Sequence, residues 1–318
     1  MLQIIVFSFN RAIQLDALIN SIFNKWKDVE ILIDVIYSSS DEVFENGYSL
    51  LKERLMKHGN VHFHKENKKK FPKWSFTELT NLYNLKLLYL CPFLRGRRTD
   101  FRDILISILK ETIAPCTMFL TDDSVFIKDI RWGNDIEQWI GIDERQHQYS
   151  YRHGLELIPD VPLDTDNNSI IFLNEKVYEW SFSAFKKNNH WGYNFSLDAH
   201  VYGTKFIYRL LNHASFSNPN TLESCVGLHV GKKNLLTIGR CGEYICILSY
   251  PINVVQKVFK NAALNASPRT LNDYYLKGYI LEYPPINNIT AFQVYPEHVY
   301  VTKNAERITL FLERNDHP

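Results

Sequence analysis

Residues 116–127, CTMFLTDDSVFI, form an apolar run that ends in two adjacent carboxylates, Asp122 and Asp123, and then turns apolar again. A short apolar run of this kind is typical of a buried β-strand. Open α/β sheets bind ligands at the carboxyl ends of their strands, where this pair would lie. Adjacent carboxylates repel each other unless a positive charge lies between them, and a divalent cation carrying phosphate oxygens would supply it. The alternative for this motif alone is a turn with two solvated acids.

The residues that precede this stretch alternate between strand and helix patterns. Residues 2–9 and 30–37 are apolar runs, and residues 60–64 form a third, shorter strand pattern. Between the first two, apolar residues recur at helical spacing over residues 13–23. This β-α-β-α-β order predicts a mostly parallel sheet with helices covering it.

Polar residues follow the first two predicted strands. Ser8, Asn10 and Arg11 would lie beside a helix N-terminus, which favours anions, so that Arg11 could pair with a phosphate or pack on a base. A helix-capping turn with a solvated arginine is the alternative. Ser38 and Ser39 end the second strand and could bind a base or a ribose, although simple turn chemistry explains them equally well.

A second informative stretch lies after the carboxylate pair. Trp191 and Tyr193 are interleaved with small and polar residues typical of a surface loop, and such rings stack on sugars. A helix is expected over residues 197–211, which would place Asp198 in its first turn, where the helix dipole stabilises an acid. Glu223 is expected in the first turn of the next helix. For both acids the functional interpretation is a base that accepts the proton of a sugar hydroxyl.

The composition excludes several classes of protein. The chain has 318 residues, a net charge of +1 and five cysteines without CxxC spacing, which disfavours nucleic acid binding, a disulfide framework and a zinc site. No apolar stretch reaches about 18 residues, the length of a spanning helix. These features predict a cytoplasmic protein, with attachment to the inner face of a membrane left open. A basic and aromatic loop could contact anionic lipid or could be solvated; its residues are Lys68, Lys69, Lys70 and Trp74.

Four segments together resemble the GT-A fold nucleotide-sugar glycosyltransferases, especially bacterial family-two-like enzymes of polysaccharide synthesis. Residues 6–11 resemble the first strand and nucleotide-binding turn of that family, and residues 121–124 resemble its metal-binding acidic motif. Residues 191–198 and 218–223 resemble its acceptor-side segments. Their order and spacing carry the resemblance, which covers roughly residues 1–260.

The resemblance implies a Rossmann-like α/β fold with a mixed, mostly parallel sheet flanked by helices and C-terminal additions. It implies a glycosyltransferase domain over residues 1–260, divided into a nucleotide-binding half, 1–125, and an acceptor half, 126–260. Residues 261–318 would form an extension that packs on the same domain.

The resemblance also implies a metal-dependent transfer of one sugar from a nucleotide-sugar donor to a glycan or lipid-linked saccharide for a surface polysaccharide. A direct displacement, which inverts the anomeric centre, is the expected course. Mg²⁺ or Mn²⁺ on Asp122 and Asp123 would bridge the donor diphosphate. Asp198 is the first choice for the base and Glu223 the second. The expected donor contacts are Ser8, Asn10, Arg11, Ser38, Ser39 and Asp122, and the expected acceptor contacts are Trp191 and Tyr193.

Two departures from the family pattern leave alternatives open. Ser124 stands where a third acid is common, so the metal would rest on Asp123 with Asp122 on the ribose or sugar, or its binding would be weakened. This departure keeps a non-catalytic glycan- or nucleotide-binding module as an alternative. The Gln-any-any-Arg-Trp motif of processive enzymes is absent, which predicts addition of a single sugar. A sugar nucleotidyltransferase is disfavoured because the turn after the first strand has no glycine.

Overall fold

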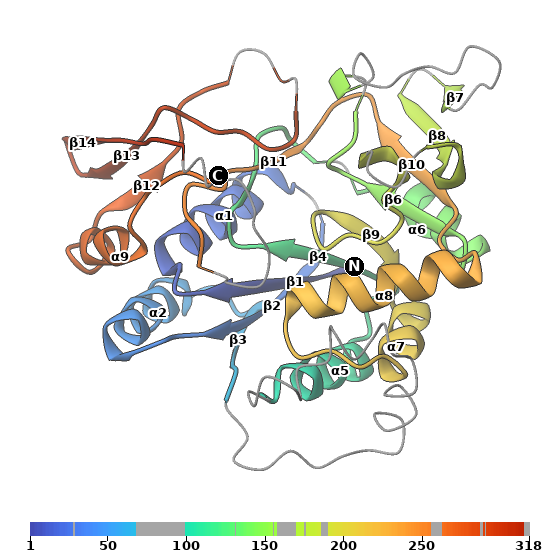
Figure 1. Cartoon of the computed structure of the whole chain (residues 1–318), viewed down its shortest axis with the longest axis horizontal. Coiled ribbons are helices and arrows are strands. Elements are labelled where there is room, and N and C mark those ends of the chain that lie inside the picture. The colour runs from blue at the N-terminus through green and yellow to red at the C-terminus, as the bar shows by residue number, and fades with distance from the viewer. Residues whose placement is uncertain are drawn as a thin grey trace.

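A computed structural model of the chain has a nine-stranded sheet at its centre, with helices on both faces (Figure 1). The residues that it describes are 1–27, 29–67, 99–130, 132–154, 156–157, 170–174, 176–185, 190–255, 263–286, 289 and 291–314. Lys68, Lys69, Lys70 and Trp74 of the predicted basic loop lie outside these residues.

The central sheet follows the order β3-β2-β1-β4-β9-β6-β10-β8-β7. Its strands are, in that order, Val61–Lys65, Ile31–Ser38, Leu2–Phe9, Cys116–Thr121, His200–Gly203, His147–Ser150, Ile238–Gly242, Val177–Ser181 and Ile170–Asn174. β3, β2, β1 and β4 are parallel neighbours, and β6 is parallel to β10. Within this sheet only β9 and β8 run against the common direction. The predicted mixed, mostly parallel α/β architecture is therefore confirmed.

Two further sheets are small. β5 (Ser124–Phe126) pairs antiparallel with β11 (Ile247–Ser249), directly after the carboxylate pair. β12 (Ile280–Glu282), β13 (His298–Lys303) and β14 (Glu306–Phe311) form an antiparallel sheet near the end of the chain.

Helices cover both faces of the sheet because the residues of β1 alternate between two cores. Leu2, Ile4 and Val6 pack with α1 (Ala12–Lys25) and α2 (Glu42–Leu55). Ile5 and Phe7 pack on the other face; the helices there are α5 (Phe101–Glu111), α7 (Thr204–Asn212) and α8 (Pro219–Lys233). Burial on both faces explains why β1 reads as a continuous apolar run rather than as an alternating pattern.

The remaining helical elements are short. They are α6 (Asn134–Ile142), α9 (Pro268–Leu276), and the 3₁₀ turns η3 (Phe182–Ala184) and η4 (His190–Gly192). α9 packs on α1 and α2, so the C-terminal segment lies against the N-terminal half of the chain (Figure 1). No helix in the described ranges is both long enough and apolar enough to cross a membrane.

The expected helix over residues 197–211 is wrong in its first half. His200–Gly203 is strand β9, which pairs with β4 and β6, and α7 begins only at Thr204. Ala199 has a φ of +57°, a left-handed conformation that a continuous right-handed helix cannot contain. Asp198 therefore does not lie in a helical first turn, and the helix dipole does not explain its presence.

Candidate active site

The carboxyl ends of β1 and β4 lie side by side. The two strands are parallel neighbours with Phe7 opposite Thr121, so the residues that follow each strand meet at the same edge of the sheet. At this edge lie Ser8 and Phe9, the last two residues of β1, and Asp122 and Asp123, which follow β4. The same edge is where parallel α/β sheets bind ligands.

Asp122 is buried, and its hydrogen bonds link the end of β4 to the end of β1 and to Arg11 after it. Its Oδ2 accepts hydrogen bonds from Ser8 Oγ at 2.8 Å and from the Phe9 N–H at 3.2 Å. Its Oδ1 accepts from Arg11 Nη1 at 2.9 Å. Burial raises the pKa of Asp122, and the Arg11 guanidinium opposes this rise. Both carboxylate oxygens are thus occupied by protein donors.

Arg11 is buried and its guanidinium is directed inward. Nη1 pairs with Asp122, while Nε and Nη2 donate to the side-chain and backbone oxygens of Asn253 at 2.7 and 2.6 Å. The expected contact of this side chain with a phosphate or base therefore does not fit the geometry. Arg11 instead ties the end of β4 to the segment that follows β11.

The other residues expected on the donor side have local partners. Asn10 has a φ of +57°, and its amide bridges to Ser40 through the Ser40 N–H and hydroxyl. Ser39 Oγ donates to Glu45 at 2.7 Å. Ser38 is half-buried at the end of β2, one strand away from Ser8. The structure thus gathers Ser8, Asn10 and Ser38 around two neighbouring strand ends, with Asn10 linking the two loops.

Thr121 joins two carboxylates that are distant in the sequence. Its hydroxyl oxygen is 2.8 Å from Asp123 Oδ1 and 3.0 Å from Asp198 Oδ1. A hydroxyl carries one hydrogen and donates to one carboxylate at a time. Each carboxylate also faces a guanidinium, because Arg11 Nη1 lies 3.5 Å from Asp123 Oδ2 and Arg152 Nη1 lies 3.4 Å from Asp198 Oδ2. Burial raises the pKa of Asp198, Arg152 opposes the rise, and Asp123 adds to it.

Glu223 lies next to Asp198 and is the third acid of this group. Its Oε1 accepts a hydrogen bond from the Leu197 N–H at 3.1 Å. Burial, and then the negative charge of Asp198, raise the pKa of Glu223 to about 7. Glu223 lies in the second turn of α8, beyond the predicted first turn, because the helix begins at Pro219 behind an Asn218 cap. A carboxyl group with a pKa near neutrality can both accept and donate a proton.

The two expected acceptor contacts differ in exposure. Tyr193 is 36% exposed, and it contacts Glu223 through its hydroxyl. Trp191 is 2% exposed, and its ring packs against Trp180 and His153. As described, Trp191 offers no face to an acceptor, which corrects the expectation of a stacking platform at this residue. Its burial follows from η4, which turns its side chain into the core.

Arg152 belongs to the same group and is absent from the sequence prediction. It follows β6, which runs in the same direction as β4, so its backbone reaches the same edge of the sheet. Nη1 donates to Ser196 Oγ at 2.8 Å and lies 3.4 Å from Asp198 Oδ2. The residues of β6, HQYS, form no apolar run, so no local sequence signal points to Arg152.

The segment after β11 covers one side of the carboxylates. The Tyr250 N–H donates to the backbone oxygen of Asp123 at 2.7 Å, and the Tyr250 ring stacks on Tyr283 at 4.1 Å between centroids. Together with Asn253, these residues bring chain from beyond residue 245 to the end of β4. The C-terminal part of the chain therefore contributes to this site.

The donor set decides which acid fits a divalent cation. Asp122 is less suited, because three protein donors already contact its two oxygens, and its expected role as a metal ligand stays a prediction. The Asp123 side chain is 17% exposed, and its Oδ1 shares one hydroxyl hydrogen with Asp198. Asp123 thus fits a hard cation, which prefers carboxylate oxygens. In the part of the chain that the structure describes, no three His, Cys, Asp or Glu side chains are arranged to hold an ion.

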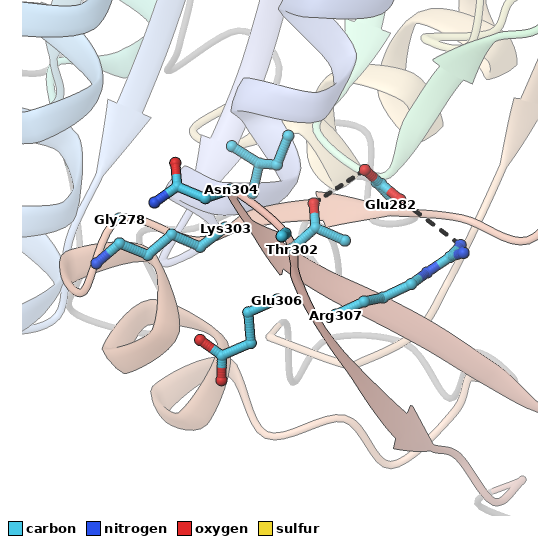
Figure 2. Close-up of a pocket in the computed structure, with 9 residues that line it drawn as sticks. Gly278, Glu282, Thr302, Lys303, Asn304, Glu306 and Arg307 are labelled. Carbon is cyan, nitrogen blue, oxygen red and sulfur yellow. Dashed lines mark hydrogen bonds and ion pairs between the residues drawn. The ribbon is translucent and has the colours of Figure 1, made fainter.

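A separate hollow of about 540 Å³ lies on the β12-β13-β14 sheet (Figure 2). The Glu282 carboxylate contacts Thr302 and Arg307 at this hollow, and the side chains of Lys303 and Glu306 point away from Glu282 (Figure 2). Its lining comes entirely from the C-terminal sheet and the turn before it, not from the strand ends of the central sheet. Asp122, Asp123, Asp198 and Glu223 do not line this hollow.

Solved structures that include those of TarS and LgtC are similar to this chain, and no protein-family model or curated protein sequence matches it. S. aureus TarS 1–349 in complex with UDP aligns with a TM-score of 0.40 and 15% identity over 76% of this chain and 56% of that one. The same fragment with UDP-GlcNAc gives 0.35 and 13% over 76% and 55%. The galactosyltransferase LgtC with donor and acceptor sugar analogs gives 0.32 and 11% over 66% and 60%. The chain thus spans less than two thirds of the length of each.

Proposed function

We propose that this chain is a glycosyltransferase that moves one sugar from a nucleotide-sugar donor to a glycan or lipid-linked saccharide acceptor in surface polysaccharide synthesis. The observation that carries the proposal is the contact of Asp123 and Asp198 through one Thr121 hydroxyl at the end of β4, with Glu223 beside them. This arrangement offers an acid for a cation next to acids for a proton, at the edge where the sheet binds ligands.

The donor side of the site is the meeting point of β1, β2 and β4. Ser8, Asn10 and Ser38 would contact the nucleoside, because they lie at the ends of adjacent strands. Asp122 and Arg11 support this wall through their mutual ion pair and Asn253, rather than by touching the donor. The proposal therefore keeps the predicted donor edge and changes the role of these two residues.

Asp123 would hold Mg²⁺ or Mn²⁺, with the remaining ligands coming from the donor and solvent. When bound, the cation would stabilise the negative charge of the diphosphate leaving group. Thr121 orients the Asp123 carboxylate through its hydroxyl.

On the acceptor side, Asp198 would take the proton of the attacking sugar hydroxyl. The hydroxyl oxygen bonds to the anomeric carbon, the bond from that carbon to the diphosphate oxygen breaks, and the proton passes to the carboxylate. A direct displacement of this kind inverts the anomeric centre. Glu223, whose pKa is about 7, is the second candidate for the base, and Tyr193 is the exposed ring that an acceptor sugar can contact.

The proposed reaction takes place in the cytoplasm, at the inner face of the membrane when the acceptor is lipid-linked. The thiols of Cys116, Cys241 and Cys246 are free, which fits a reducing compartment. Membrane contact through Lys68, Lys69, Lys70 and Trp74 stays a prediction from the sequence.

A thermal-shift screen against UDP, GDP, CMP and dTDP, each with and without Mn²⁺, tests the donor site. A ligand that binds only the folded state raises the melting temperature. We expect one nucleotide to give a Mn²⁺-dependent rise that Asp123→Asn abolishes. The matched control is Asp129→Asn, because Asp129 is an exposed acid that pairs with Lys25 and Lys27. A Mn²⁺-dependent rise that persists in Asp123→Asn would refute the assigned cation site, and no rise with any nucleotide would favour the glycan-binding alternative.

A further inference from the structure

Arg152 is a buried guanidinium whose contacts converge on the proposed base. Its side chain is 4% exposed, although it follows a strand at the ligand-binding edge of the sheet. One amino group reaches Ser196 Oγ and Asp198 Oδ2, and the other lies 3.2 Å from His190 Nδ1. The contacts therefore fix the guanidinium from two sides and aim one edge of it at Asp198.

Stability alone does not explain a guanidinium at this position. Its Nε has no hydrogen-bond partner among the described residues, and the ion pair with Asp198 is 3.4 Å long. Removing a charge from water costs several kcal/mol, which only well-formed pairs and hydrogen bonds offset. Apolar residues of similar volume would fill such a space at less cost.

Phe292, from the C-terminal segment, covers the guanidinium. The Arg152 carbon Cζ lies 3.8 Å from the centre of the Phe292 ring, the geometry of a cation–π contact. His190 packs edge-on against the same ring at 4.6 Å. Residues more than 100 positions further along the chain thus hold the arginine against the 190–198 segment.

Ser196 connects Arg152 to the backbone segment that carries Asp198. Ser196 Oγ accepts from Arg152 and also from the Asp198 N–H at 3.2 Å. The Tyr202 hydroxyl bonds to both backbone groups of Ser196. Arg152 therefore contacts both the carboxylate and the turn that orients it.

We infer that Arg152 is a positioning residue, whose charge holds the Asp198 carboxylate directed at Thr121 while Phe292 keeps the guanidinium in place. The inference deepens the proposed glycosyl transfer and rests on it. Arg152 acts through Asp198 and does not itself contact the reacting atoms.

Several charged or titratable groups face Asp198 from the elements around it. They are Asp123 after β4, Arg152 after β6, Tyr193 and His190 in the 190–193 segment, and Glu223 on α8. Burial raises the pKa of Asp198, and among these groups Arg152 is the one that lowers it most. Burial, and after it the charge of Arg152, lower the pKa of His190, so that loss of Arg152 would also raise the pKa of His190. Loss of Arg152 should leave Asp198 protonated over a wider pH range.

The test compares Arg152→Met, Arg152→Lys and the control Arg240→Met. Arg240 is a matched arginine that pairs with Glu179 at 2.8 Å and stacks on Trp139 at 4.2 Å, on β10. The readouts are the pH profile of donor turnover and the carboxyl ¹³C titration of Asp198, assigned with Asp198→Asn. We expect Arg152→Met to move the acidic limb and the titration upward by about one pH unit or more, a shift typical of losing a nearby opposite charge. Arg152→Lys should bring the acidic limb and the Asp198 titration most of the way back to their wild-type positions. Arg240→Met should change neither the pH profile nor the titration.

Phe292→Leu provides a second test if Arg152→Met does not fold. It keeps the charge and removes the ring, so kcat should fall several-fold while nucleotide affinity stays unchanged. An Asp198 titration that is the same in the wild type and in Arg152→Met overturns the inference, whether or not the donor is turned over. A shifted titration in a chain that turns over no donor supports the electrostatic role of Arg152 and refutes the proposed transfer.

Discussion

Replacing Glu223 by glutamine should change how the stability of the fold depends on pH. Glutamine has nearly the same shape and keeps an oxygen that can accept the Leu197 N–H, but it carries no charge at any pH. Burial and the neighbouring Asp198 raise the pKa of Glu223 from its ordinary value of 4.5 to about 7. The folded state therefore holds a proton on Glu223 in a pH range where the unfolded chain has released it.

The sign and size of the effect follow from these two values. Between pH 4.5 and 7 the folded chain binds more protons than the unfolded chain, so the free energy of unfolding falls as the pH rises. Each pKa unit corresponds to about 1.4 kcal/mol, so a shift of about 2.5 units removes at most about 3 kcal/mol by pH 8. The glutamine variant does not lose this contribution. The free energy of unfolding of Glu223→Gln should be close to that of the wild type at pH 4 and higher than that of the wild type at pH 8.

Urea unfolding followed by tryptophan fluorescence at pH 4, 5, 6, 7 and 8 measures this difference. Other groups with raised pKa values, such as Asp198 and Glu66, give the wild type a similar pH trend. Subtracting wild-type from variant stability at each pH isolates the part that depends on Glu223. Glu111→Gln is the control, because Glu111 is an exposed acid on α5 bonded to Ser107. If the difference between Glu223→Gln and the wild type is the same at pH 4 and pH 8, the raised pKa is refuted.

Three further substitutions test separate parts of the structure. Asp122→Asn should lower the free energy of unfolding by about 3–5 kcal/mol, because it leaves the buried Arg11 charge with only the longer, 3.5 Å pair to Asp123; stability within about 1 kcal/mol of the wild type would contradict this in urea unfolding. Gly239→Ala should cost about 1–3 kcal/mol, since an added Cβ would lie 2.4 Å from the Trp180 ring, and an unchanged melting temperature would show that the ring moves freely. Tyr193→Ala should raise the acceptor KM several-fold with the nucleotide affinity unchanged, because it removes the exposed ring, and a change in nucleotide affinity instead would place Tyr193 on the donor side.

The sequence predicts the first half of the sheet well because its signals are local. Each of β1, β2 and β4 is an apolar run followed by polar residues, and burial on both faces of a parallel sheet produces that pattern. The position of Asp122 and Asp123 at a strand end follows directly from it. The donor edge is therefore readable from the order of residues.

The environment of each side chain at that edge is not readable in the same way. Asn253 binds the Arg11 guanidinium from 242 positions along the chain, and no local pattern signals such a contact. A sequence can place Arg11 at the mouth of the sheet but cannot show that its charge is already paired. The same limit applies to Trp191, whose burial depends on packing against Trp180 and His153.

The turn at Asp198 shows tertiary pairing overriding a helical pattern. β9 completes the sheet between β4 and β6, and its pairing outweighs the apolar spacing that suggested a helix; Val201 and Tyr202 themselves favour strands. The resulting turn brings Asp198 to Thr121 and Arg152. The sequence thus identifies the acid, while its partners come from strands that only the fold places together.

Donor turnover tests the central claim most directly. The wild type and Asp123→Asn would be incubated with UDP-, GDP-, CMP- and dTDP-sugars and Mn²⁺, with simple saccharides as acceptors, and the released nucleotide would be quantified. The proposed function predicts release from one class of donor, increased by an acceptor and reduced at least about tenfold in Asp123→Asn, with Asp129→Asn unchanged. Release that is equal in Asp123→Asn and the wild type would contradict the assigned site, and no release from any donor would contradict the glycosyltransferase itself.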